Sequence, residues 1–230
     1  MSNLIERRQL MLDELAREFD VEQFVLRFRD KQFDFWKPAD PDSLFDQQVI
    51  ETPHNELEWQ PYWAQVWLAA VGLCHELMDL DLEGQQVLDL GCGLGITGAV
   101  AASQGAQVIL ADNAPPALLF AGLNCLNWSD NTEVMNVNWL KDELAVRFDL
   151  ILGADIIYDR NDLVHLDRFW RKHLAETGVV LLTEPSRLMS KDLIAGLEEL
   201  GWKIARNIRR REVEFEEQVR TVNCFELRAN

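Results

Sequence analysis

The sequence has few cysteines and few histidines, four of each in 230 residues. Cys74, Cys92, Cys125 and Cys224 form no C-x-x-C pair, and the histidines show no ligand spacing. Zinc clusters and disulfide frameworks of small secreted domains need such spacings or an extracellular context. We therefore expect no metal site and no disulfide framework, and we predict a reducing compartment, the cytoplasm.

Long apolar runs and an export signal are also missing. The segment Ala64–Leu73 is among the longest apolar stretches and contains the polar residue Gln65. It is well short of the roughly 18 apolar residues that a membrane-spanning helix needs. No apolar segment follows a basic one near the N-terminus, as a signal peptide would require. The sequence therefore predicts no membrane association.

Basic residues are scarce relative to acidic ones. There are 22 lysines and arginines against 39 aspartates and glutamates, and the net charge is −17. Such a surface repels phosphate backbones, so we expect no nucleic-acid partner. A basic partner is one interpretation of this charge, and simple solubility is the other. The oligomeric state does not follow from the sequence.

The first 60 residues differ in pattern from the rest of the chain. Residues 3–30 show apolar positions at helical spacing with charges between them, and aromatic residues cluster over 33–45. The pattern predicts a helical N-terminal cap or lid over residues 1–60. The main domain is predicted over residues 61–230, a length that suits one α/β domain.

A glycine-rich turn follows a buried strand at residues 87–95. The run Val87–Leu90 is apolar apart from Asp89, and Gly91, Gly93 and Gly95 allow positive φ and a close approach of the backbone. Helical spacing resumes at residues 96–102. This unit of strand, glycine turn and helix predicts a cofactor site. A second strand, residues 107–112, ends in Asp112.

The acid at Asp89, the Gly-x-Gly-x-Gly turn and Asp112 together resemble motif I and the second-strand acid of the class I S-adenosylmethionine (SAM) dependent methyltransferases. This resemblance implies SAM as the cofactor and S-adenosylhomocysteine as its product. It also implies that the Asp112 carboxylate accepts hydrogen bonds from both ribose hydroxyls. The implied cofactor-binding residues in this region are Asp89, Gly91, Cys92, Gly93, Gly95, Asp112 and Asn113.

A nicotinamide dinucleotide is the alternative cofactor, because Gly93, Gly95 and Gly98 also satisfy G-x-G-x-x-G. A carboxylate at Asp89 would crowd a pyrophosphate, and about 85 residues precede the turn. Both features favour the methyltransferase interpretation over an NAD(P)-dependent oxidoreductase.

Helices and strands alternate downstream of the turn. We expect helices at 61–74, 115–127, 161–174 and 190–200, and strands at 133–137, 149–154 and 178–183. Two further strands, 202–208 and 220–227, are expected to form an antiparallel pair joined by the charged stretch 209–217. The predicted fold is α/β and Rossmann-like: a doubly wound, mainly parallel seven-stranded sheet with a C-terminal antiparallel strand and a helical N-terminal cap.

The strand at 149–154 is followed by Asp155-Ile-Ile-Tyr158, at the sheet edge where ligands bind. This sequence resembles the Asp/Glu-x-x-Tyr signature of the protein-lysine methyltransferase and nicotinamide N-methyltransferase-like group. The segment around Trp67 resembles the helix of that group in which a tryptophan lies against the cofactor. The resemblance implies catalytic roles for Asp155, which orients the amine, and Tyr158, which forms the substrate wall. It implies cofactor contacts for Trp67, Asn138, Trp139 and Ala154.

The resemblance implies a protein lysine side chain as the methyl acceptor, and the acidic net charge favours a basic protein as its carrier. A small-molecule N-methyltransferase, an NAD(P)-dependent oxidoreductase and a SAM-binding protein without catalytic activity remain as alternatives. Methyl transfer to nitrogen needs alignment and exclusion of water rather than a metal or a covalent intermediate.

Overall fold

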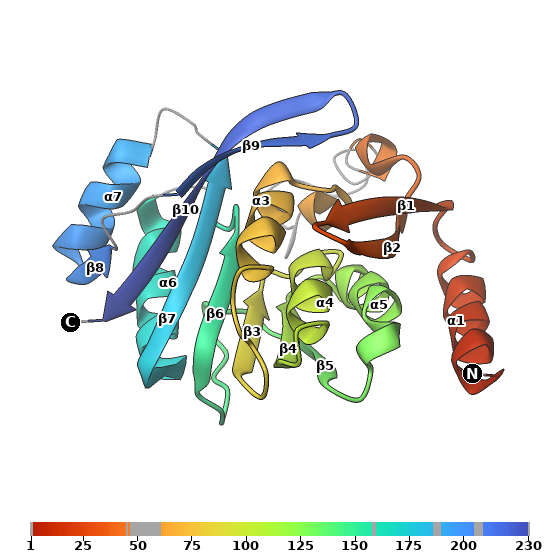
Figure 1. The fold of residues 1–230 in the computed structure, drawn as a ribbon, viewed down its shortest axis with the longest axis horizontal. Helices are drawn as coiled ribbons and strands as arrows, with labels where there is room; N and C mark the ends of the chain where they lie inside the picture. Colours follow the sequence, from red (N-terminus) through yellow and green to blue (C-terminus); the bar gives the residue numbers. More distant parts are fainter. Residues whose placement is uncertain are drawn as a thin grey trace.

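The computed structural model describes residues 2–44, 46, 61–157, 160–185, 190–204 and 209–229. Within these residues a central β-sheet has helices on both faces, and a separate two-stranded hairpin lies beside it (Figure 1). The sheet order is β5-β4-β3-β6-β7-β10-β8, and β9 pairs with β10. The strands are β3 (Gln86–Leu90), β4 (Gln107–Asp112), β5 (Thr132–Asn136), β6 (Phe148–Ala154), β7 (Leu174–Pro185), β8 (Trp202–Ile204), β9 (Arg209–Phe215) and β10 (Gln218–Ala229).

The five strands from β5 to β7 are parallel to their neighbours, whereas β10 is antiparallel to β7, β8 and β9. The predicted fold class is therefore confirmed: a mainly parallel, doubly wound sheet with antiparallel pairing at its C-terminal end. The carboxyl ends of β3, β4 and β6 meet at one edge of the sheet. In such sheets this edge is where ligands bind.

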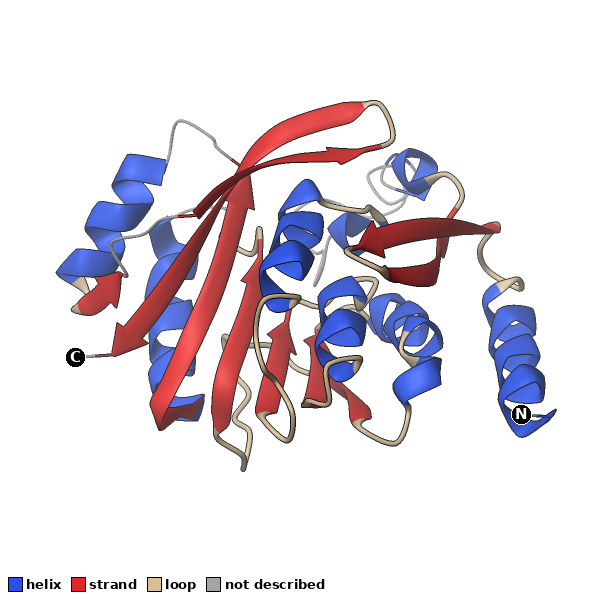
Figure 2. Cartoon of the chain, viewed as in Figure 1, coloured by secondary structure: helices blue, strands red, loops and turns tan. Residues whose placement is uncertain are grey.

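Helices cover the two faces of the sheet, as Figure 2 shows. Contacts to the strands come from α3 (Leu68–Leu77), α4 (Ile96–Ala102) and α5 (Pro115–Asn124), and also from α6 (Arg160–His173). Val87 belongs to the buried cluster under α3, α4 and α5, whereas its neighbour Leu88 belongs to the cluster that includes α6 and α7 (Ser190–Glu199). Successive side chains of a strand point to opposite faces, so a strand covered on both faces is apolar throughout. None of the described helices is long and apolar enough to cross a membrane.

The N-terminal segment is only partly helical. The helix α1 (Ser2–Leu15) ends well before residue 30, and the chain then forms the antiparallel hairpin of β1 (Val21–Phe28) and β2 (Lys31–Pro38). The helical prediction for residues 3–30 is therefore wrong beyond Leu15. Buried Leu26 and Phe28 alternate with exposed residues, which is the two-residue period of a half-buried strand. Residues 45 and 47–60 of the predicted cap lie outside the described part of the chain.

The helix predicted to start at Pro61 is interrupted. The chain forms the short 3-10 helix η1 (Pro61–Ala64), and α3 starts at Leu68 with Trp67 as its extended N-cap residue. Trp63 and Trp67 therefore do not share one helix face. Trp63 packs instead against the rings of Phe19 and Phe120, and this packing competes with continuation of the helix.

The predicted antiparallel pairing of the two C-terminal segments is confirmed, since β8 pairs with β10, but the chain between them differs from the prediction. The charged stretch 209–217 contains strand β9, which forms a hairpin with β10 and makes the sheet eight-stranded rather than seven-stranded. Of the predicted strand 202–208, the structure describes β8 (Trp202–Ile204), and residues 205–208 lie outside the described residues. An exposed edge strand can be charged on one face, so its sequence resembles a loop.

Candidate active site

The turn between β3 and α4 depends on glycine at two positions. Gly91 has φ +65°, and a Cβ there would lie 2.9 Å from Cγ2 of Ile156. Gly95 has φ +73°, and a Cβ there would lie 2.9 Å from both Cα and Cβ of Ala121. The left-handed conformation and the close contacts both exclude a side chain. The turn is therefore packed directly against Ile156, which follows β6, and against Ala121 of α5.

A Gly95→Ala substitution is expected to destabilise the protein by about 2 to 4 kcal/mol, from the left-handed backbone and the contact with Ala121. Gly84→Ala is the matched control, because Gly84 has φ +71° and no heavy atom within 4 Å of the ideal Cβ position. It should lose only about 1 kcal/mol. Urea denaturation measures both, and equal losses would show that the contact with Ala121 is unimportant.

Asp89 anchors the glycine turn from beneath. Its carboxylate accepts hydrogen bonds from Oγ1 of Thr97 at 2.7 Å and from the backbone N–H of Gly98 at 2.8 Å, and the residue is 2% exposed. Burial raises the pKa of Asp89 to about 6, although these hydrogen bonds oppose the shift. Asp89 does not line the cavity described below, so its position supports a structural role rather than the predicted cofactor contact.

The raised pKa of Asp89 predicts that the free energy of unfolding depends on pH. The unfolded chain releases the Asp89 proton near pH 3.8 and the folded chain near pH 6, so stability from this group is lost as the pH rises between these values. Asp89→Asn has no carboxyl proton to release, and its amide oxygen can still accept the Gly98 N–H, so the variant abolishes this loss. The unfolding free energy of the variant, relative to wild type, should rise by about 2 kcal/mol from pH 4 to pH 7.

Urea denaturation at several pH values measures this difference. An Asp130→Asn variant, which is changed at an exposed acid, is the control. Parallel pH profiles for wild type and Asp89→Asn would contradict the prediction.

Asp112 ends β4 beside the turn. Its Oδ2 atom accepts the Gly93 N–H at 2.9 Å, and its Oδ1 atom accepts the Ala114 N–H at 3.0 Å. Burial raises the pKa of Asp112, and these backbone N–H groups act in the opposite direction. A carboxylate has about four lone-pair sites. Each oxygen can therefore accept a further bond from a hydroxyl group in the cavity.

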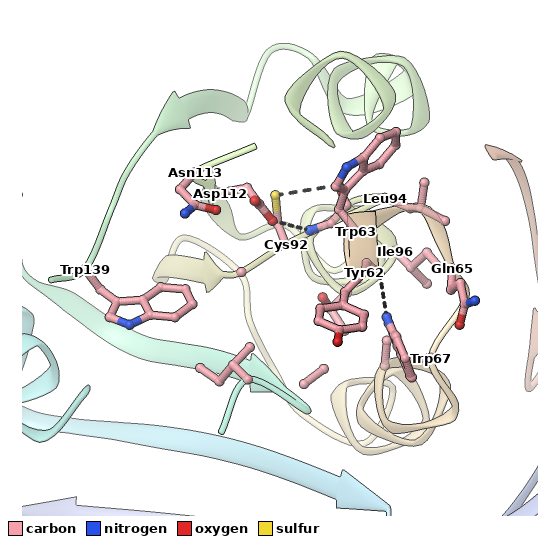
Figure 3. A pocket seen from close by; sticks show the side chains of 16 residues that line it. Tyr62, Trp63, Gln65, Trp67, Cys92, Leu94, Ile96, Asp112, Asn113 and Trp139 are labelled. Atoms are coloured by element: carbon pink, nitrogen blue, oxygen red, sulfur yellow. Dashed lines mark hydrogen bonds between the residues drawn. The ribbon is translucent and has the colours of Figure 1, made fainter. Parts of the chain in front are cut away.

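A cavity of about 250 Å³ lies over the glycine turn at the carboxyl edge of the sheet. Eight predicted cofactor-binding residues line it: Trp67, Gly91, Cys92, Gly93, Asp112, Asn113, Trp139 and Ala154. Figure 3 shows Asp112 and Asn113 on one side of the view, Trp139 on a second side, and Tyr62 and Trp67 on a third. The structure thus brings together residues from five separate segments of the chain.

Two further predicted cofactor residues do not line this cavity. Gly95 lies at the start of α4, where it serves the packing against Ala121. Asn138 caps the following turn: its Oδ1 atom accepts the Leu140 N–H at 3.0 Å, and its own N–H donates to Asp142 at 2.8 Å. Their positions give no support to direct cofactor contacts.

Several lining residues were not predicted, among them Tyr62, Gln65, Thr97 and Ile156. Thr97 lies two residues after the third glycine, so its place in the first turn of α4 was a usable signal. Ile156 follows β6 next to the predicted Asp155. Tyr62 lies in η1 and Gln65 follows that short helix, and no sequence pattern points to either residue.

Trp67 forms one corner of the cavity. Its indole N–H donates to the Tyr62 carbonyl oxygen at 2.7 Å, and the two rings meet edge to face with centroids 6.2 Å apart (Figure 3). This bond holds the ring from its polar end, so the apolar surface remains available to a ligand.

The buried thiol of Cys92 is less suited to chemistry, because burial raises its pKa well above the usual value.

A second cavity, of about 450 Å³, adjoins the first. Gln65 and Trp67 line both cavities, and Asp155 lines the second. Asp155 is 6% exposed and has φ +55°, and its N–H donates to the Thr183 carbonyl oxygen at 2.8 Å. A non-glycine residue with positive φ next to a cavity favours a functional role. Tyr158, the other predicted catalytic residue, lies outside the described residues.

These residues fit a nucleoside cofactor with a short charged tail. Asp112 offers two carboxylate oxygens, the glycine turn presents backbone without side chains, and Trp139 offers an apolar ring. Within the described ranges, no group of three or more His, Cys, Asp or Glu side chains is arranged to hold a metal ion.

Comparison with known proteins agrees with this geometry. The family described as lysine methyltransferase matches residues 54–198. The electron transfer flavoprotein beta subunit lysine methyltransferase of Mus musculus is 36% identical over 154 residues, covering 59% of this chain and 58% of the relative. The protein N-lysine methyltransferase METTL21A of Xenopus tropicalis is 35% identical over 169 residues, covering 66% of this chain and 76% of the relative. The match thus spans less than two thirds of the mouse relative.

Among solved structures, the N-methyltransferase NodS of Bradyrhizobium japonicum in complex with S-adenosyl-L-homocysteine superposes with a TM-score of 0.57. The alignment covers 80% of this chain and 98% of NodS at 17% identity. At this identity the likeness shows the fold alone, which is the Rossmann-like fold of these methyltransferases.

Proposed function

This chain belongs to the lysine methyltransferase family, and we propose that it transfers a methyl group from SAM to a lysine side chain of a protein. The arrangement of the two adjoining cavities supports this proposal most directly. Asp112 and the glycine turn line the first cavity, Asp155 lines the second, and Trp67 lies between them. A cofactor in the first cavity and an amine in the second would meet at Trp67.

The residues of the first cavity would bind SAM by their chemical character. Asp112 would accept hydrogen bonds from both ribose hydroxyls, and the Gly91–Gly93 backbone would lie against the methionine part. Trp139 would pack on the adenine ring, with Asn113 beside the adenosine. The bound cofactor supplies a methyl group on a positively charged sulfur.

The transfer itself requires an unprotonated amine in line with the methyl group. The lysine nitrogen would use its lone pair to form a bond to the methyl carbon, and the electron pair of the broken carbon–sulfur bond would stay on sulfur. The ammonium group must first lose a proton, and desolvation together with the nearby sulfonium charge lowers its pKa. Asp155 would orient the amine and balance its charge, whereas Tyr158 is proposed for the substrate wall.

The acceptor is proposed to be a basic protein. The net charge of −17 would attract such a partner over long distances and speed the encounter. Exposed residues at the second cavity, including Gln218 and Thr221, are accessible to a protein side chain. The cytoplasmic location stays a prediction from cysteine usage.

Calorimetric titration with S-adenosylhomocysteine, NADH and NADPH tests the cofactor. We expect S-adenosylhomocysteine to bind at micromolar concentration and the two nicotinamide nucleotides not to bind. Labelled SAM added with cell lysate then tests the acceptor, and label on lysine residues of protein bands supports the proposal. Label found only in small molecules would favour a small-molecule N-methyltransferase, and binding of a nicotinamide nucleotide alone would contradict the proposed activity.

A further inference from the structure

We propose that Arg220 selects acceptor lysines that have an acidic residue beside them, an inference that rests on the proposed lysine methylation. Arg220 lines the second cavity together with Asp155, so this cavity has one basic and one acidic side chain. Asp155 faces the amine in the proposed reaction. Arg220 is then available to a carboxylate of the same substrate.

The hairpin of β9 and β10 places Arg220 at the cavity. Arg220 pairs with Val213 in the hairpin and lies two residues from Val222, so the three side chains share one face. Val213 and Val222 are buried, and Val222 packs so closely on α3 that a Cβ at Gly72 would lie 2.7 Å from it. Arg220 therefore faces the start of α3, where residues 66–69 line the same cavity.

The tip of the hairpin is held by the N-terminal strands. The Phe215 ring meets the Phe24 ring of β1 with centroids 5.6 Å apart. Lys37 of β2 forms ion pairs with Glu22 at 2.8 Å and with Glu216 at 3.4 Å, and it is 8% exposed. These contacts fix the hairpin above the sheet edge (Figure 1), so the position of Arg220 is set by packing on both sides.

The charge of Arg220 is not neutralised by a carboxylate within the described residues. Its described side-chain hydrogen bond goes to the Val219 carbonyl oxygen at 3.0 Å. By contrast, Arg171, Arg211 and Arg228 each form an ion pair with an acidic side chain. In a chain with 39 acidic residues, an arginine without such a pair at a cavity favours an acidic ligand.

The N-terminus of α3 adds to the positive character of this wall. Its N-cap residue Trp67 makes no side-chain capping bond, and residues 66–69 line the cavity. A helix N-terminus favours a nearby negative charge. A substrate with a lysine toward Asp155 and a neighbouring carboxylate toward Arg220 would satisfy both ends of the cavity. The net negative charge attracts the substrate protein as a whole, whereas Arg220 contacts a single carboxylate beside the acceptor lysine.

The test uses synthetic peptides with a single lysine whose neighbouring position is Glu, Gln or Lys, together with free lysine and labelled SAM. Wild type should show a kcat/KM about 5-fold higher for Glu than for Gln, as expected for a partly exposed ion pair. Arg220→Gln should remove this preference, and Arg220→Glu should favour the Lys neighbour. Arg228→Gln, on the same strand but outside this cavity, is the matched control and should keep the wild-type preference.

Equal rates on Glu and Gln peptides in wild type would overturn the role of Arg220 and leave lysine methylation intact. Methyl transfer to free lysine alone would contradict the proposal that the acceptor is a protein. If only lysate proteins are labelled, the labelled lysines are mapped in those proteins. Replacing the acidic residue nearest to a labelled lysine with Gln should then lower labelling by the wild-type enzyme but not by the Arg220→Gln enzyme. Labelling without this dependence contradicts the inference, and no transfer to any acceptor contradicts the proposed function as well.

Discussion

An Asp112→Ala variant is expected to bind S-adenosylhomocysteine about 5- to 150-fold more weakly, a loss of about 1 to 3 kcal/mol. The proposed ribose hydrogen bonds are removed, and so are the bonds that the carboxylate accepts from Gly93 and Ala114. The turn next to the cofactor therefore loses an anchor at the same time. Calorimetric titration of the purified variant measures the effect.

Asp112→Asn separates the two contributions. The amide oxygen can still accept one backbone N–H, but an amide group has only one accepting oxygen. We expect a weaker loss of binding than for alanine and a smaller change in melting temperature. Asp130→Ala, at an exposed position, is the control for the loss of one negative charge. Unchanged affinity in Asp112→Ala would remove the ribose role of this residue.

An Asp155→Asn variant is expected to lose about 100-fold in kcat, because a misplaced amine attacks the methyl group inefficiently. Its affinity for S-adenosylhomocysteine should stay within about twofold, since Asp155 lines the second cavity and not the first. Asparagine tolerates the φ of +55° at this position, so the backbone should be retained. Labelled methyl transfer to an identified acceptor measures kcat.

The matched control is Asp149→Asn at the opposite end of β6. Asp149 accepts the Gln86 N–H at 3.0 Å and lies outside both cavities. It should keep wild-type turnover. Normal turnover in Asp155→Asn would contradict the orienting role, whereas a loss in both variants would indicate a general effect on β6.

The glycine turn and its flanking strands were predictable because local chemistry determines them. An apolar run must be buried, and glycine adopts the left-handed φ of Gly91 and Gly95 without the strain that a side chain would add. Asp112 follows from the same reasoning, since it ends a buried strand at the carboxyl edge of a parallel sheet. These features agree with the family resemblance and with the observed cavity.

The N-terminal and C-terminal hairpins were not predictable in the same way. Residues 21–38 and 209–217 form strands whose exposed faces are charged, and their register depends on partners that are distant in the sequence. Phe24 and Phe215 are separated by most of the chain but meet in the structure. Sequence patterns do not show such pairs.

The sequence by itself determined the parallel α/β framework, the glycine turn and the acids at the ends of β3, β4 and β6, because each depends on short-range periodicity and backbone freedom. Only the tertiary structure decided which acids reach a cavity. Asp89 is buried under α4 by its bonds to Thr97 and Gly98, whereas Asp112 lines the first cavity and Asp155 the second. The physical reason is that exposure depends on how helices and hairpins pack around a residue, and this packing joins segments that are far apart in the chain.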